Sequence, residues 1–69
     1  MYLENGEILH LANKKSYRVN GFNVYDNTYY YLLENIDNNK YTVVNTYLID
    51  SELYLKEVKD EDILIKLNF

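Results

Sequence analysis

SYRVNGFNVYDNTYYYLLENI, residues 16–36, contains two runs rich in β-branched and aromatic residues, separated by Asp26-Asn27. Such residues favour strands, whereas Asp and Asn favour tight turns. We therefore expect two antiparallel strands, at 16–25 and 28–36, joined by a short turn.

In the first of these strands the alternation of apolar residues shifts by one position in the middle. In a regular strand Val19 would point to one face, whereas Phe22 and Val24 would point to the other. The Asn20-Gly21 pair lies at this change and has two interpretations. It is the favoured pair of a type I′ hairpin turn. Alternatively, Gly21 takes a positive φ in a β-bulge, and one bent strand returns its apolar side chains to a single face. We favour the bulge, since two hairpins so close together would leave a very short strand between them.

The second strand is apolar on both faces, with Tyr29, Tyr31 and Leu33 on one face and Tyr30 and Leu32 on the other. A strand of this kind is central in its sheet, or its outer face is covered by another element.

Three further strands are predicted from the same signals, at 7–12, 41–48 and 52–58. The segment 60–67 begins with acids and ends near Lys66, the polarity that suits a helix dipole. We favour a short helix capped by Asp60 and docked on the sheet, because two turns of helix are marginal alone. A sixth strand at 62–67 is the alternative, since its apolar residues also alternate.

These elements predict an all-β fold in a single domain, residues 1–69. We expect five short antiparallel strands forming a strongly bent sheet or SH3-like barrel, with a short C-terminal helix. The chain has 69 residues, of which 48% are hydrophobic and 26% charged, and this composition is typical of one small globular domain.

The composition also excludes several classes of site. Cys and Pro are absent and Gly numbers only two, which rules out disulfides, thiolate ligands, a thiol nucleophile and a Gly-rich phosphate loop. Seven basic residues against eleven acidic ones give a net charge of −4. Proteins that bind duplex nucleic acid present a basic face, so we expect no direct duplex partner. With no long apolar segment and no signal-peptide pattern, we expect no membrane partner and a cytoplasmic location.

Catalytic and metal-binding patterns are weak. His10 is the only histidine, and Ser16 and Ser51 are the only serines. His10 and Ser16 flank one predicted turn, but a triad also needs an acid and an oxyanion site. The turn at 37–39 lacks the EF-hand spacing, and adjacent acids at 60–62 diverge around a helix. We therefore expect no catalytic residue, no metal and no cofactor.

Tyrosine is the most abundant large side chain, with nine Tyr beside two Phe. Tyrosine is enriched at protein interfaces, because it combines rigid contact area with a polar tip. We expect a non-enzymatic protein-binding module, whose partner is another protein or a second copy of the chain. Packing of a two-sided central strand and a stacking platform for single-stranded nucleic acid are the other interpretations. The predicted contact residues are Tyr29, Tyr30, Tyr31, Tyr47 and Tyr54.

The last third of the chain is acidic, with six acids against three lysines over residues 50–69. A solvated face explains this charge. The alternative is an inhibitor that presents carboxylates in place of nucleic-acid phosphates, as in anti-restriction or anti-CRISPR proteins. A structural homo-oligomer is the third hypothesis. The predicted acidic surface consists of Asp50, Glu52, Glu57, Asp60, Glu61 and Asp62.

Four spaced motifs run along the chain, Gly6-x-Ile8-x-x-Leu11, Lys15-x-Tyr17-x-Val19, Tyr29-x-Tyr31-Leu32 and Val58-x-Asp60. Together they resemble the short, acidic, uncharacterised β-barrel proteins of low-GC Gram-positive bacteria and their phages. The resemblance implies a small β-barrel fold and a bacterial, phage or mobile-element source, and it implies no catalytic residue.

Overall fold

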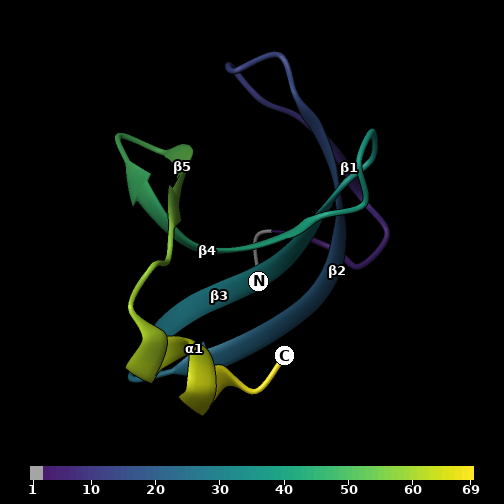
Figure 1. Cartoon of the computed structure of the whole chain (residues 1–69). Coiled ribbons are helices and arrows are strands. Elements are labelled where there is room, and N and C mark those ends of the chain that lie inside the picture. Colours follow the sequence, from purple (N-terminus) through teal and green to yellow (C-terminus); the bar gives the residue numbers. More distant parts are fainter. Residues whose placement is uncertain (1–2) are drawn as a thin grey trace.

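The computed structural model describes residues 3–69 and confirms the all-β fold. One antiparallel sheet has the strand order β1-β2-β3-β4-β5 and curls into a half-barrel, with one short helix beside it (Figure 1). The finer assignment to an SH3-like barrel stays a prediction. The elements are β1 (Ile8–His10), β2 (Ser16–Tyr25), β3 (Thr28–Asn35), β4 (Tyr41–Ile49), β5 (Glu52–Glu57) and α1 (Glu61–Leu67).

The β2–β3 and β4–β5 hairpins both have two-residue turns, and the first of them is the turn that the sequence predicts at Asp26-Asn27. Asp26 and Asn27 have φ values of 52° and 60°, and Asp50 and Ser51 have φ values of 50° and 68°. Positive φ at both central positions is the type I′ turn, whose twist matches that of the flanking strands. These turns fix the registers of the β2–β3 and β4–β5 pairs.

The β-bulge in β2 is confirmed, and the hairpin interpretation of Asn20-Gly21 is wrong. Val19 lies opposite Leu33 and Gly21 lies opposite Leu32, so Asn20 is the extra residue. The expected positive φ at Gly21 is also wrong, since Gly6 is the described glycine with a positive φ, at 86°. Gly21 instead leaves room for a ring, because a Cβ there would lie 3.2 Å from the side chain of Phe69.

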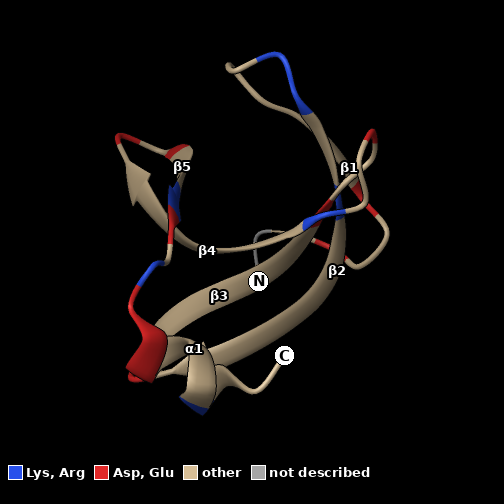
Figure 2. Cartoon of the chain, in the orientation of Figure 1, with Lys and Arg blue, Asp and Glu red and all other residues tan. Residues whose placement is uncertain are grey.

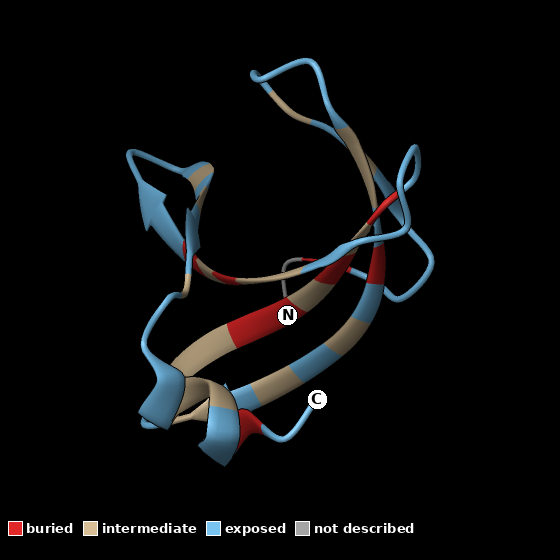
Figure 3. Cartoon of the chain, in the orientation of Figure 1, coloured by how far each residue is buried: buried red, intermediate tan, exposed pale blue. Residues whose placement is uncertain are grey.

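Figure 3 shows buried residues concentrated along β3 and the neighbouring parts of β2. The cross-strand pairs Val19–Leu33 and Tyr31–Val44 place the buried cluster on one face of the sheet. The bulge brings both halves of β2 onto this face, and β3 has a strand on each side. The hydroxyl of Tyr31, a residue that is 0% exposed, accepts a hydrogen bond of 3.2 Å from the backbone N–H of Leu3. The buried cluster consists of Leu3, Val19, Tyr31, Leu33 and Val44.

The C-terminal segment is a helix, as favoured, and not a sixth strand. The Asp60 carboxylate caps it by accepting from the backbone N–H groups of Asp62 and Ile63, at 2.9 and 3.4 Å. Such a cap satisfies N–H groups that have no partner within the helix.

The helix docks on β2 through Leu67, which is buried. The side-chain amide of Asn23 in β2 donates a 2.8 Å hydrogen bond to the Leu67 carbonyl. The Lys66 ammonium lies 5.4 Å from the centre of the Tyr25 ring. The side chain of Lys66 hydrogen-bonds with that of Tyr25. This hydrogen bond, and to a lesser extent the Coulombic interaction with Tyr25, raises the pKa of Lys66.

The first strand is shorter than the predicted range 7–12. The Leu11 carbonyl accepts the Lys14 N–H at 3.0 Å, so the chain already turns at Leu11. β1 consequently presents a short edge, Ile8–His10, to the open side of the half-barrel.

Candidate functional site

Two of the predicted contact tyrosines belong to the core, which corrects the expectation for β3. Tyr31 is 0% and Tyr30 is 7% exposed, because β3 is central and both of its faces are covered. Tyr29 is half-buried and packs against Phe22, with ring centroids 5.7 Å apart. The run Tyr29–Tyr31 therefore serves mainly to fill the core.

The other two predicted tyrosines form an exposed pair on the β4–β5 hairpin. Tyr47 and Tyr54 lie directly opposite each other, and their rings stack at 5.6 Å with an interplanar angle of 18°. Each residue is 40% exposed. The Tyr54 hydroxyl donates to the Glu52 carboxylate at 3.2 Å. Stacking and this hydrogen bond hold the two rings ready for contact at little further entropy cost.

The end of the same hairpin exposes aliphatic side chains that the sequence analysis did not select. Leu48 and Ile49 are each 50% exposed and directly precede the turn. Their signal was present in the sequence, because a two-residue turn after an apolar run leaves the last apolar residues without cover. Because side chains alternate along a strand, Ile49 lies on the same face as the tyrosine pair, whereas Leu48 lies on the opposite face with its partner Leu53. We call Tyr47, Ile49 and Tyr54 the hairpin surface.

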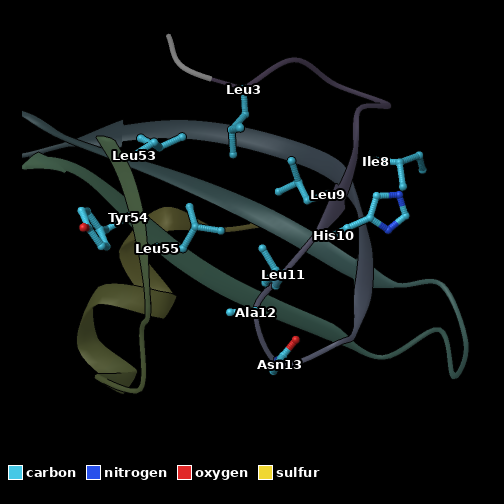
Figure 4. A pocket seen from close by; sticks show the side chains of 10 residues that line it. All are labelled: Leu3, Ile8, Leu9, His10, Leu11, Ala12, Asn13, Leu53, Tyr54 and Leu55. Carbon is cyan, nitrogen blue, oxygen red and sulfur yellow. The ribbon is translucent and has the colours of Figure 1, made fainter. Parts of the chain in front are cut away.

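An apolar groove of about 630 Å³ adjoins the hairpin surface on the open side of the half-barrel. Figure 4 shows Leu9 and Leu11 on the β1 side of this space and Leu53 and Leu55 on the β5 side. Its size falls in the range of ligand-binding clefts, roughly 300–1,000 Å³. The groove lies between the two outermost strands of the sheet, so no motif within either strand could have predicted it. Its lining consists of Leu3, Ile8, Leu9, His10, Leu11, Ala12, Asn13, Leu53, Tyr54 and Leu55.

The predicted acidic surface is divided into two parts. Figure 2 shows one acidic group around the β4–β5 turn and another at the start of α1, with lysine positions between them. Lys56 and Lys59 separate the groups along the chain, Glu57 lies between these two lysines, and Asp60 is engaged as the helix cap. The six acids therefore do not form one continuous array of negative charge.

His10 and Ser16 are brought together, but not in the arrangement of a hydrolase. His10 Nδ1 and Ser16 Oγ are 2.8 Å apart, in an exposed position. Within residues 3–69, no hydrogen bond or ion pair joins His10 to a carboxylate that could orient its ring. Within the same residues, no group of three or more His, Asp or Glu side chains could hold a metal ion.

Comparisons with known proteins identify no relative of this chain. No protein family, no curated protein and no solved structure matches the chain. The resemblance to small bacterial and phage β-barrels consequently stays a prediction. No helix in the described part, residues 3–69, is long and apolar enough to cross a membrane.

Proposed function

We propose that the chain is a non-enzymatic protein-binding module, and that it binds through the hairpin surface. The observation that carries the proposal is the exposed, stacked pair Tyr47–Tyr54, with the half-exposed Ile49 on the same face of the hairpin. Aromatic residues are enriched at the centres of protein interfaces and account for much of the binding energy. A tyrosine pair that is already ordered by stacking loses little freedom on binding.

The adjoining groove supports the same proposal, because it extends the apolar surface from the hairpin across to β1. Large exposed apolar patches on small soluble domains commonly mark interaction sites. The acidic-inhibitor alternative has less support, since the acids lie in two groups with lysines between them.

Affinity capture with matched variants tests the proposal. The immobilised chain is compared with the double variant Tyr47→Ser/Tyr54→Ser, and each captured protein is then purified and titrated against both. We expect the double variant to weaken the affinity at least about tenfold, because interface aromatics commonly contribute more than 1 kcal/mol each. Tyr41→Ser is the control, since Tyr41 is 58% exposed on β4 but lies outside the hairpin surface.

A further variant separates the two functional hypotheses. Glu61→Lys/Asp62→Lys reverses charge at the start of α1 and leaves the Asp60 cap in place. We expect this variant to bind like the unaltered chain. Loss of binding here, with full binding by the tyrosine double variant, would overturn the proposal in favour of acidic mimicry.

A further inference from the structure

The outer edge of β5 has backbone groups available for another strand. β5 pairs with β4 and lies at the end of the sheet order. The Val58 N–H donates to the Val43 carbonyl at 2.8 Å, which identifies this pair as hydrogen-bonded. Because antiparallel ladders alternate, Tyr54 and Lys56 also direct their backbone groups to β4. The N–H and C=O groups of Leu53 and Leu55 therefore point away from the sheet.

The sequence of this edge is complementary to itself. Residues 52–56 read Glu-Leu-Tyr-Leu-Lys, in which Leu53 and Leu55 are symmetric about Tyr54 and the two ends carry opposite charges. When two copies pair antiparallel about Tyr54, Leu53 lies opposite Leu55 of the second copy. Glu52 then lies opposite Lys56 of the second copy, and the reverse pair forms by symmetry. The outward-pointing residues meet each other in this register, as an antiparallel ladder requires.

The neighbouring registers match less well. Residues whose backbone N–H and C=O groups point away from β4 must lie opposite one another in the two copies. The nearest alternative registers are therefore centred on Leu53 or on Leu55. Centring it on Leu55 places Leu53 opposite the charged Glu57. Centring it on Leu53 places Leu55 opposite Ser51 in the turn. The register centred on Leu53 or on Leu55 leaves one leucine opposite its own copy and the other opposite a polar residue, whereas the register about Tyr54 pairs both leucines with leucines and also pairs acid with base.

Both charged ends of this segment are exposed in the folded chain, and neither is in the ion pair found within residues 3–69, which joins Arg18 and Glu34. The Glu52 carboxylate accepts one hydrogen bond, from the Tyr54 hydroxyl at 3.2 Å, and a carboxylate can accept others besides. Every second residue of a strand points to the same face, so Glu52, Tyr54 and Lys56 share one face of β5. In the dimer the two Glu52–Lys56 pairs would therefore flank the two Tyr54 rings. Charged and aromatic cross-strand pairs of this kind stabilise antiparallel ladders.

The exposed area leaves room for such an interface. The chain exposes 5114 Å², whereas a monomer of this mass is expected to expose about 4,600 Å². The surplus is a large part of the roughly 800 Å² that each partner buries in a standard interface. The open side of the half-barrel, where the groove lies, is one source of this surplus.

We propose that a second copy of this chain binds the β5 edge, forming a two-fold symmetric dimer with a continuous sheet through β5. This inference rests on the proposed function in one respect, because it names a second copy of the chain as the protein that binds at the β4–β5 hairpin. A two-fold axis through Tyr54 makes the interface isologous, which is the commonest symmetry of soluble oligomers. The pairing supplies about four backbone hydrogen bonds, two cross-strand leucine pairs and two ion pairs.

Charge exchange tests the dimer by analytical ultracentrifugation over a hundredfold dilution. Glu52→Lys and Lys56→Glu each convert both ion pairs into like-charge pairs, so we expect either variant to weaken dimerisation by roughly tenfold or more. The double variant Glu52→Lys/Lys56→Glu restores both ion pairs and should dimerise like the unaltered chain. An equimolar mixture of the two single variants should form a heterodimer. Lys59→Glu, outside β5, is the control with the same charge change as Lys56→Glu.

Three outcomes would overturn the dimer: a monomer at every concentration, single variants that dimerise normally, or a mixture that stays monomeric. None of these touches the proposed function, because affinity capture of another protein through Tyr47 and Tyr54 is measured independently. Conversely, a dimer that follows the charge rules, with no other protein captured, would leave self-association as the role of the hairpin.

Discussion

Tyr31→Phe removes one buried hydroxyl and tests how the N-terminal segment closes the core. In the folded chain this hydroxyl accepts the backbone N–H of Leu3 at 3.2 Å, and both residues are buried. Phenylalanine keeps the ring and its packing but leaves the Leu3 N–H without this acceptor. An unsatisfied buried polar group costs about 1–3 kcal/mol. The total free energy of unfolding of a domain this small is only roughly 3–10 kcal/mol.

The assay is thermal unfolding followed by circular dichroism, with urea unfolding to convert the shift into a free energy. Each kcal/mol corresponds to about 4–8 °C in a domain of this size, so we expect Tm to fall by at least about 4 °C. Tyr41→Phe is the matched control, because it removes the same hydroxyl group from a tyrosine that is 58% exposed. A Tyr31→Phe variant as stable as this control would refute the reasoning, and with it the closure of the core by Leu3.

Two further substitutions test local energetics. Asp60→Ala removes the cap of α1 and should lower the free energy of unfolding by about 1 kcal/mol, whereas Glu61→Ala, beside it, should change little; urea unfolding measures both, and equal effects would contradict the capping role. Thr46→Val replaces the Thr46 Oγ1, which is buried without a hydrogen-bond partner among the described residues, and should stabilise the chain by roughly 1 kcal/mol. Destabilisation by Thr46→Val, measured in the same way, would show that water or another group satisfies that hydroxyl.

Local signals were sufficient to predict most of the fold. The parity change at Asn20 predicted the bulge, because period-two alternation is strict within a strand. Asp26-Asn27 predicted a tight turn, since both residue types tolerate a positive φ. The acidic start of residues 60–67 predicted the helix and its cap, since N-terminal N–H groups attract carboxylates.

The candidate site was harder to predict, because exposure depends on which strands are neighbours. Tyr30 and Tyr47 look alike in the sequence, but Tyr30 is covered and Tyr47 lies on an outer hairpin. The stacking of Tyr47 on Tyr54 follows from the register set by the Asp50-Ser51 turn, and this register is not visible in the composition. The groove needs the curl of the whole sheet, which no single segment specifies.

The open edge of β5 also bears on solubility. An unpaired apolar edge can add strands from other chains without limit, and natural proteins commonly block it with charge or cover it. Pairing about Tyr54 would consume the edge in a closed dimer, since an isologous contact satisfies itself. Lys56 would then serve two purposes, repelling unrelated strands and pairing with Glu52 of the second copy.

Amide hydrogen exchange along β5 is the most direct test of the claim that this hairpin binds a partner strand. The N–H groups of Tyr54 and Lys56 bond to β4, so we expect them to be protected at every protein concentration. The N–H groups of Leu53 and Leu55 point away from the sheet, so we expect their protection to appear only as the concentration rises and the dimer forms. Leu53 and Leu55 amides that exchange rapidly at every concentration, including those at which the chain is dimeric, would contradict the account.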